Sequence, residues 1–419
     1  MSKIDLKYGR GTIALDIDES RFSVLSREAA ALPLSDAEIG ERLDSPSGSP
    51  GIGELIQPGQ TVLIVVPDAT REVGCGQVVN LLVRRLIAEG VNAFDIRLIF
   101  ATGIHRKTTE AEKAAIVTPF IAQRIKMLDH DPRDLMRLTR LGETAGGIPI
   151  ELDRALVEHD HVILIGGVSF HYFAGFTGGR KLICPGLAST RTITGTHKLA
   201  FDSDRMDRRE GVGPARLDGN PVHNAFVEAA SAAPPSFAVT TVVNDLGEIV
   251  DLYCGDWIRS HRAACDAFAE QNRTVIAEKR GLVIAGCGGY PHDINMIQAH
   301  KALDAASRAC TPGGTIILLA ECPDGLGRAD MIDWFDAADT AEMAVRLSEK
   351  YQVNGQTAWS IKRLCEEFNV ILVSSLAPNL ADKMGMVPAD SLPAAMEKAA
   401  RWSSGYILTN GARTLIEAF

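Results

Sequence analysis

Short apolar runs alternate with amphipathic stretches through the last third of the chain, and this alternation limits the possible fold most strongly. The runs 281–285, 314–320, 369–374 and 405–409 indicate buried strands. Helical patterns occupy 293–309, 337–350, 357–367 and 392–401. Strands that are joined through helices pair in parallel. This segment therefore predicts a small, doubly wound, mostly parallel α/β domain, whose functional edge lies at the carboxyl ends of its strands.

The first two thirds of the chain show a looser α/β pattern. Apolar strands are expected at 61–66, 96–100 and 161–165, with an amphipathic helix at 77–89. Each of these strands ends in a polar or glycine-rich turn, which indicates one shared crevice. We expect a long loop at 202–221 and a bridging helix at 260–278. The sequence thus predicts an N-terminal α/β domain over 1–275, a C-terminal α/β domain over 276–419, and an active-site cleft between them.

Composition excludes several classes of protein. The chain has 419 residues with 43 Lys and Arg against 53 Asp and Glu, a formal net charge of −10. Such a balance lacks the basic footprint of a nucleic-acid binder. The longest apolar runs, such as 62–66 and 316–320, are far shorter than the roughly 18 residues of a membrane span. The start, MSKIDLKYGRG, has no apolar signal region, and the eight cysteines are scattered. We expect a cytoplasmic protein with no membrane and no nucleic-acid partner.

Two strand ends carry residues suited to chemistry. Asp68, Ala69, Thr70 and Arg71 follow the first strand, where backbone N–H groups and the Arg71 fork suit a phosphate or carboxylate. The alternative is an Asp/Thr helix cap with a surface arginine. His105 follows the glycine turn after the second strand and is placed for a general base. A structural histidine in a loop is the alternative there.

The segment 166–197 is the densest in glycine, aromatic and basic residues. His171 stands among aromatic and small residues, and Gly178 and Gly179 permit close backbone approach to a ligand. Arg180 next to Lys181 lowers the pKa of the lysine by like-charge repulsion, which favours covalent use. The alternative is a solvated, glycine-rich surface loop.

The second domain offers weaker signals. The segment 286–291, GCGGYP, has Pro291 where a dinucleotide-binding fingerprint needs its third glycine. Gln298 and Lys301 are three residues apart and share a helix face, where they could meet an anionic substrate. An exposed polar face is the alternative.

Taken together in this order, the motifs resemble one family. The chain resembles the nickel-pincer-nucleotide-dependent lactate racemase family, which includes other 2-hydroxyacid racemases and epimerases. The resemblance is carried by the motifs PDATR, ATGIHR, FHYFAGFTGGRKLICPGLA, the histidine at 197 and GGYPHDINMIQAHK. The resemblance runs over nearly the whole chain. It implies a cofactor built from a pyridinium mononucleotide with two thiocarboxylate arms and a nickel ion.

The resemblance also implies roles for residues at matching positions. It places the covalent thioamide link of the cofactor on Lys181 and makes His197 the protein ligand to nickel. The remaining cofactor contacts implied are Asp68, Ala69, Thr70, Arg71, Gly178 and Gly179. Its two catalytic histidines correspond to His105 and His171, one for each hand of the substrate. Its substrate contacts correspond to Arg71, Gln298 and Lys301.

The implied activity is inversion at C2 of a 2-hydroxyacid. A base takes the hydroxyl proton while the C2 hydrogen moves as hydride, and the planar 2-oxoacid receives hydride on its other face. In the lactate enzymes a tryptophan helps to close the pocket, whereas Gln356 stands near that place here, before Trp359. This predicts a substrate that is longer or more polar than lactate, such as a sugar acid or a hydroxy-dicarboxylate. His292 and Asp293 are candidate polar contacts to it. Separate cofactor-maturation enzymes are implied as partners.

Two other readings stay open from the sequence. One is a non-catalytic carrier or sensor of the nickel nucleotide, which needs Lys181 and His197 but no paired histidines. The other is an enzyme without nickel that uses Lys181 to form a Schiff base with a carbonyl substrate.

Overall fold

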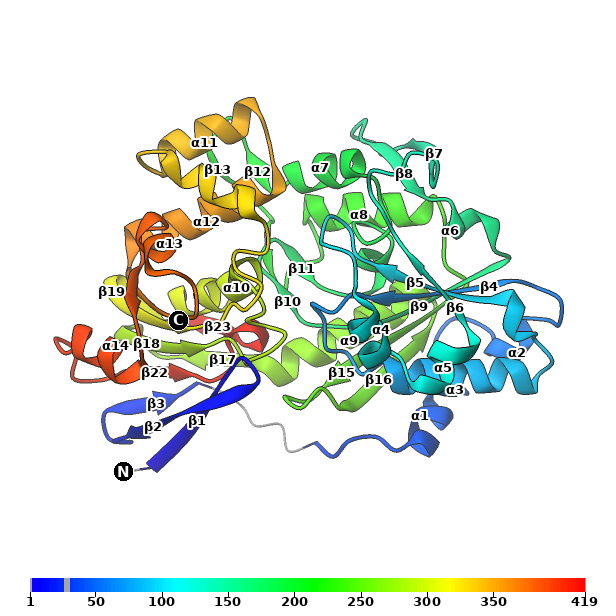
Figure 1. The fold of residues 1–419 in the computed structure, drawn as a ribbon, viewed down its shortest axis with the longest axis horizontal. Helices are drawn as coiled ribbons and strands as arrows, with labels where there is room; N and C mark the ends of the chain where they lie inside the picture. The colour runs from blue at the N-terminus through cyan, green and yellow to red at the C-terminus, as the bar shows by residue number, and fades with distance from the viewer. Residues whose placement is uncertain (1, 26–30, 419) are drawn as a thin grey trace.

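A computed structural model describes residues 2–25 and 31–418. Two α/β units lie side by side, each built on a six-stranded sheet (Figure 1). The predicted class, two α/β domains of which the C-terminal one has a small, doubly wound, mostly parallel sheet, is confirmed. In the described residues no helix is both long and apolar enough to cross a membrane.

The first sheet has the order β16-β15-β9-β4-β5-β6. Only β16 runs antiparallel to its neighbour. Its strands are β4 (Val62–Pro67), β5 (Ile96–Ala101), β6 (Lys126–Asp129), β9 (His161–Gly167), β15 (Phe237–Val243) and β16 (Ile249–Gly255). The helices of this unit are α1 (Asp36–Leu43), α2 (Ile52–Leu55), α3 (Cys75–Ala88), α4 (Glu110–Ile116), α5 (Pro119–Arg124), α6 (Ala155–Glu158), α7 (Thr190–Lys198), α8 (Pro221–Ser231) and α9 (Trp257–Asn272), with 3-10 turns η1 (Ala93–Asp95) and η2 (Gly179–Leu182).

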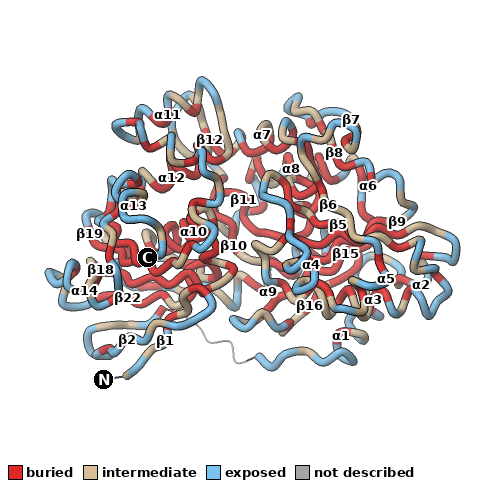
Figure 2. Tube along the Cα trace, viewed as in Figure 1, coloured by how far each residue is buried: buried red, intermediate tan, exposed pale blue. Residues whose placement is uncertain are grey.

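The central strand β4 is apolar along its whole length because both faces of the sheet are covered. Val62, Ile64 and Val66 pack with α1, α3 and α5 on one face. Leu63 and Val65 point to the other face, where η2, α7 and α8 cover them. The buried core therefore runs through the sheet on both sides (Figure 2), and the polar residues after each strand are left at its carboxyl edge.

The second sheet is wholly parallel, in the order β21-β20-β19-β18-β22-β3. Its strands are β3 (Phe22–Val24), β18 (Arg280–Gly286), β19 (Cys310–Leu319), β20 (Asn369–Val373), β21 (Val387–Ala389) and β22 (Gly405–Leu408). The helices around it are α10 (Met296–Ser307), α11 (Thr340–Glu349), α12 (Val353–Glu367), α13 (Pro378–Lys383) and α14 (Leu392–Lys398), with 3-10 turns η3 (Ala329–Asp336) and η4 (Gly411–Arg413).

The start of the chain packs against this second unit. The hairpin β1 (Ser2–Tyr8) and β2 (Gly11–Ile17) covers the sheet face of Leu282 and Ile284 with Leu6 and Ile17. Strand β3 then pairs with β22 at the sheet edge. Figure 1 shows this hairpin beside the C-terminal strands. Residues 2–24 therefore belong to the second unit, although the sequence predicted them in the N-terminal domain. For the rest of the chain, the predicted domain boundary near residue 275 stays a proposal.

Several predicted segments differ in detail. The bridging helix ends at Asn272, and β17 (Arg273–Ile276) follows, paired with β23 (Leu415–Ala418). Within and beside the predicted 202–221 loop, the chain forms three strands of two residues each. The other small pairs are β7 (Leu138–Glu143) with β8 (Pro149–Asp153) and β10 (Phe170–His171) with β11 (Ala174–Phe176). The two-residue strands are β12 (Phe201–Asp202), β13 (Asp207–Arg208) and β14 (Gly213–Pro214). Strand β12 pairs with β13, and β14 pairs with β11.

Candidate active site

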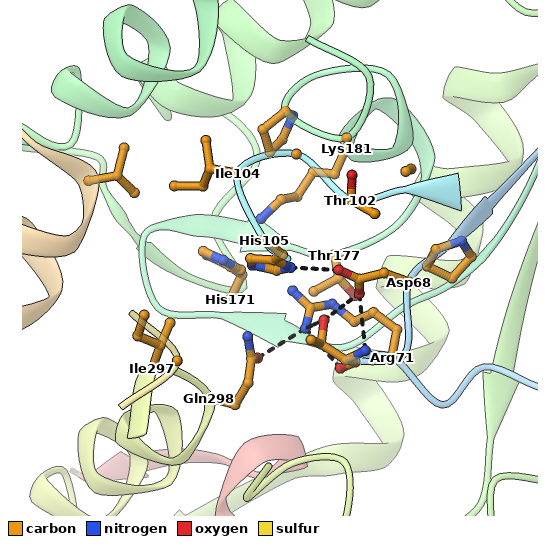
Figure 3. A pocket seen from close by; sticks show the side chains of 18 of the residues that line it. Asp68, Arg71, Thr102, Ile104, His105, His171, Thr177, Lys181, Ile297 and Gln298 are labelled. Carbon is orange, nitrogen blue, oxygen red and sulfur yellow. Dashed lines mark hydrogen bonds and ion pairs between the residues drawn. The ribbon is translucent and has the colours of Figure 1, made fainter. Parts of the chain in front are cut away.

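A cavity of about 460 Å³ lies where the two units face each other. The carboxyl ends of β4, β5 and β9 form one wall, and α10 and α12 form the opposite wall. Figure 3 shows side chains from both walls pointing into this space. The cavity brings together almost all of the residues singled out from the sequence: Asp68, Ala69, Thr70, Arg71, His105, His171, Gly178, Lys181, His197, Gln298 and Lys301.

Asp68 organises the turn after β4. Its Oδ1 accepts hydrogen bonds from the backbone N–H of Thr70 at 3.0 Å and from Thr70 Oγ1 at 2.5 Å. Its Oδ2 lies 2.7 Å from Nδ1 of His105 (Figure 3). Burial opposes ionisation of this carboxyl group, but His105, Arg71 and Thr70 outweigh burial and lower its pKa from 3.8 to about 2. An ionised Asp68 therefore fixes the orientation of the His105 ring.

A polar chain crosses the cavity between the two units. Nη1 of Arg71 donates to Oε1 of Gln298 at 3.0 Å, and Nζ of Lys301 donates to the same oxygen at 2.6 Å. The amide oxygen of Gln298 thus separates two buried cations. Burial, followed by repulsion from Arg71, holds the pKa of Lys301 well below its usual value.

The turn before Lys181 depends on glycine. Gly178 and Gly179 have φ of +76° and +51°. A Cβ on Gly178 would lie 2.8 Å from the carbonyl oxygen of Gly167, and one on Gly179 would lie 2.7 Å from the ring of His261. Gly178 lines the cavity, whereas Gly179 packs beneath it against His261.

Lys181 extends from this turn into the cavity (Figure 3). Its ammonium nitrogen lies 5.7 Å from the ring centroids of both Phe173 and Phe226. Burial, followed by repulsion from Arg180 and Arg71, holds the pKa of Lys181 well below its usual value. The predicted effect of Arg180 thus has the right sign, but burial is the larger cause. A lowered pKa makes the neutral, nucleophilic form of the amine easier to reach.

His197 is held by its own helix, α7. Its Nδ1 lies 2.8 Å from the carbonyl oxygen of Ile193, so Nδ1 carries the hydrogen and Nε2 keeps its lone pair. Burial and the nearby Lys181 lower the pKa of His197 to about 3. A neutral ring with a free lone pair is what a metal ligand requires.

The described residues contain no group of three or more His, Cys, Asp or Glu side chains arranged to hold a metal ion. A metal bound at His197 would therefore take most of its ligands from a non-protein molecule. This fits a cofactor that would supply its own donor atoms and take one imidazole from the protein.

His171 lines the same cavity as His105. The ring is 6% exposed and packs edge-on against Phe173, with centroids 4.4 Å apart. Burial, followed by the charges of Lys181 and Lys301, holds its pKa well below the usual value. His171 is therefore neutral at physiological pH.

Positive charge dominates the interior around the cavity. Arg71, Lys181 and Lys301 line it against one buried carboxylate, that of Asp68. Arg180 behind the wall is 1% exposed and bonds only to carbonyl oxygens and His261 in the described structure. Uncompensated buried cations are costly, so this site is built for an anionic ligand.

The wall contributed by α12 differs from the sequence prediction. Val353, Asn354 and Thr357 line the cavity. Gln356 instead turns to the hydroxyl of Tyr351, and Trp359 packs edge-on against Phe201 at 5.5 Å. The prediction that Gln356 takes the place of the closing tryptophan is therefore wrong, because the helix points that side chain away from the cavity.

His292 and Asp293, which precede α10, were predicted as polar contacts to the substrate, and the structure places them elsewhere. Oδ2 of Asp293 accepts hydrogen bonds from the backbone N–H groups of Gly9, at 2.7 Å, and Glu321, at 3.2 Å. Asp293 thus ties the first hairpin to the second sheet. Neither His292 nor Asp293 lines the cavity. The sequence missed Tyr172, whose hydroxyl lies 3.4 Å from Oγ1 of Thr357 across the two units. It stands beside His171 in a motif that was already singled out.

Fold and site together define an α/β enzyme that encloses a small anionic molecule between two domains. Residues 8–208 match the lactate racemase N-terminal domain, and residues 275–407 match the lactate racemase C-terminal domain. A lactate racemase from Lactiplantibacillus plantarum is 32% identical over 409 residues, 95% of each chain. One from Thermoanaerobacterium thermosaccharolyticum is 31% identical over 339 residues, covering 80% of this chain and 78% of that one.

Solved structures agree with these matches. The lactate racemase apoprotein from Thermoanaerobacterium thermosaccharolyticum superposes with a TM-score of 0.88 at 27% identity, covering 99% of this chain and all of that one. A Thermotoga maritima protein shares the fold, with a TM-score of 0.73 at 21% identity over 94% of this chain. The chain belongs to the lactate racemase family. It is a racemase, and the family implies a nickel-dependent cofactor.

Proposed function

We propose that this protein inverts C2 of a 2-hydroxyacid by proton-coupled hydride transfer, through a 2-oxoacid. One observation supports this most directly: a single cavity gathers a lysine of lowered pKa, a histidine with a free Nε2, the histidines His105 and His171, and an arginine. Its curated relatives carry the name lactate racemase, which gives the reaction class.

The chain's residues fit a nickel-pincer nucleotide. Lys181 would hold it covalently, and Nε2 of His197 would bind the nickel. The turn from Asp68 to Arg71, together with Gly178, would contact its polar groups, with Gly179 supporting the turn. When bound, this cofactor would accept hydride from C2 of the substrate and return it. Removal of C2–H as a proton would instead demand an enolate, which is costly without strong stabilisation of its charge.

The substrate-handling groups come from both domains. Arg71 would bind the substrate carboxylate through its planar fork, and Gln298 and Lys301 would hold the remaining oxygens. His105 would accept the hydroxyl proton through Nε2, since Asp68 occupies Nδ1. His171 is the second catalytic histidine. Closure between the domains would exclude water and protect the 2-oxoacid from loss.

The side chains that α12 presents to the cavity indicate the kind of substrate. Asn354 and Thr357 give this wall polar side chains, and Val353 gives it one apolar contact. Such a wall suits a 2-hydroxyacid that is longer or more polar than lactate. A cytoplasmic location and dependence on separate maturation enzymes belong to the same proposal.

The decisive experiment is intact mass and nickel content of protein co-produced with the cofactor-making enzymes. We expect a mass increase that maps to Lys181 and about one nickel per chain. A panel of chiral 2-hydroxyacids, from lactate to sugar acids, would then identify the substrate. An unmodified chain without nickel, from a host that loads a known relative, would contradict the proposal.

One second candidate has an observation in its favour. The depressed pKa of Lys181 equally suits a Schiff base with a carbonyl substrate. Borohydride trapping of a 2-oxoacid on Lys181 in nickel-free protein would support that candidate. Loaded protein with nickel but without turnover on any hydroxyacid would instead indicate a carrier or sensor.

A further inference from the structure

Two hydroxyl groups meet in the cavity wall where the two units touch. The hydroxyl of Tyr172 lies 3.4 Å from Oγ1 of Thr357, which is long for a bond whose usual length is about 2.7–2.8 Å. In the described residues, the Thr357 hydroxyl has one further bond, to the carbonyl oxygen of Val353, also at 3.4 Å. Both side chains line the cavity. Their mutual bonds are weak, so a ligand oxygen can compete for both hydroxyls.

His300 adds an unpaired acceptor to the same wall. Its Nδ1 lies 2.5 Å from the carbonyl oxygen of Ile297, so Nδ1 carries the hydrogen and Nε2 the lone pair. Within the part of the chain that the structure describes, Nε2 has no hydrogen-bond partner. The side chain lines the cavity and is 1% exposed. Burial and the nearby Lys301 lower the pKa of His300 to about 4, which keeps the ring neutral at neutral pH.

Tyr172, His300 and Thr357, which we call the distal group, lie next to a proposed catalytic residue. The Tyr172 ring stands edge-on to the His300 ring, with centroids 4.5 Å apart. On its other side it lies nearly parallel to the ring of His171, at 5.4 Å. The distal group is therefore one ring away from His171. A substrate whose C2 is held at His171 would reach this group with the part of its chain beyond C2.

The cations around the cavity do not offer a free partner to a second carboxylate beside the distal group. Arg328 is paired with Asp330 through two bonds, at 3.0 and 2.8 Å. Arg106 is paired with Asp324 at 2.9 Å. Lys301 is bonded to the amide oxygen of the polar chain that crosses the cavity. A carboxylate at the distal group would lose its hydration without a free counter-charge, which is costly.

We infer that the substrate is a polyhydroxy acid, and that one of its hydroxyls beyond C2 binds between the hydroxyls of Tyr172 and Thr357, beside His300. The inference rests on the proposed function and narrows its substrate class. A hydroxyl both donates and accepts, so it can donate to one of these two oxygens and accept from the other. A methyl group would leave both without a ligand partner. A carboxylate only accepts, and it would meet the lone pair of His300.

The first test compares substrates on loaded protein, with loading checked by mass and nickel content. Inversion at C2 is followed for threonate and gluconate, which are polyhydroxy acids, for malate, and for 2-hydroxybutanoate. We expect kcat/KM for the better polyhydroxy acid to exceed that for malate and for 2-hydroxybutanoate by about tenfold or more. If malate or 2-hydroxybutanoate is inverted equally well or better, the inference is overturned while the proposed function stands. If loaded protein inverts none of the four, both fail.

The second test removes one hydroxyl at a time with little change of shape. Tyr172→Phe and Thr357→Val should each lower the ratio of kcat/KM for the better polyhydroxy acid to that for the faster of the other two probes by about tenfold. Because the ratio compares two substrates in one protein, losses of folded or loaded protein cancel. Tyr253→Phe, whose hydroxyl bonds to Asp251 outside the cavity, is the control and should leave the ratio unchanged. An unchanged ratio in both cavity variants would overturn the inference.

Discussion

At the scale of single residues, the surroundings of a side chain decide its chemistry more than its type. His105, His171 and His197 all line this cavity, yet each has a different partner at Nδ1: a carboxylate, a backbone N–H or a helix carbonyl. In the neutral rings, these partners place the hydrogen on Nδ1 of His105 and His197 and on Nε2 of His171. The sequence placed all three residues but could not distinguish their ring forms, because the partners come from turns and helix geometry.

Replacement of Asp68 by asparagine tests the support given to His105. The amide oxygen can still accept the Nδ1 hydrogen, but it carries no charge to stabilise a protonated ring. We expect kcat on the identified substrate to fall by about 100-fold, with the fold preserved. Steady-state kinetics on nickel-matched protein would measure this. An unchanged kcat would show that the pair only orients the ring.

The same carboxylate links stability to pH. Its pKa is about 2 in the folded protein and 3.8 for an unperturbed aspartate, so folding favours the ionised form. The contribution, about 2 kcal/mol, is full above the unfolded pKa and is lost as pH falls through the folded value. The gap in unfolding free energy between wild type and Asp68→Asn should therefore be widest above about pH 5 and narrow toward pH 2. Urea titrations of the unloaded proteins at several pH values would show it. If this difference in unfolding free energy widened on acidification, the lowered pKa of Asp68 in the folded protein would be contradicted.

At the scale of elements, hydrophobic periodicity predicted the strands and helices that pack locally. The expected strands at 281–285 and 369–374 correspond to β18 and β20, and the expected helix at 77–89 to α3. The first 25 residues gave no such signal. Strand β3 has three residues and pairs with β22, nearly 400 positions away in the chain, a contact that local patterning does not encode.

The catalytic edge was predictable for a physical reason, and the α12 wall was not. Parallel strands place their carboxyl ends at one edge, so Asp68, His105 and the turn after β9 had to meet. Which face of α12 meets the cavity depends on how that helix packs against α10 and η3. Thr357 faces inward and its neighbour Gln356 does not, a rotation of one residue that sequence alone leaves open.

The N-cap of α7 offers a test of how this element holds His197. Oγ of Ser189 accepts the N–H of Thr192 at 3.1 Å and donates to Glu151 at 2.8 Å. Ser189→Ala should lower the free energy of unfolding by about 1 kcal/mol and weaken nickel retention, since His197 lies in the last turn of the helix. Chemical denaturation and nickel analysis would measure the two effects. Ser231→Ala is the control, because the Ser231 hydroxyl bonds within an exposed turn of α8. It should lower the free energy of unfolding by less than about 0.5 kcal/mol. Equal losses of stability in the two variants would exclude a special role for the N-cap of α7.

At the scale of the whole molecule, the domains meet across like charges. Arg71 and Lys181 come from the first unit and Lys301 from the second, and all three are partly buried and line the cavity. Ion pairs at the rim hold the units together, including Arg106 with Asp324 at 2.9 Å and Arg208 with Asp304 at 3.2 Å. The rim thus links the two units through ion pairs, while the basic side chains at the centre favour an anion.

This arrangement predicts that small anions stabilise the unloaded protein. Millimolar phosphate, at ionic strength held constant with sodium chloride, should raise Tm, because a bound anion offsets the repulsion among the buried cations and binds only the folded state. Lys301→Gln should reduce the rise, since it removes the cation of the second domain. Lys107→Gln serves as the control, because Lys107 lies outside the cavity with a side chain that is 65% exposed. Thermal scans of the three proteins over a phosphate series would measure the effect. An equal rise in all three would assign it to general exclusion of phosphate from protein surfaces and would remove the anion-binding cavity as its cause.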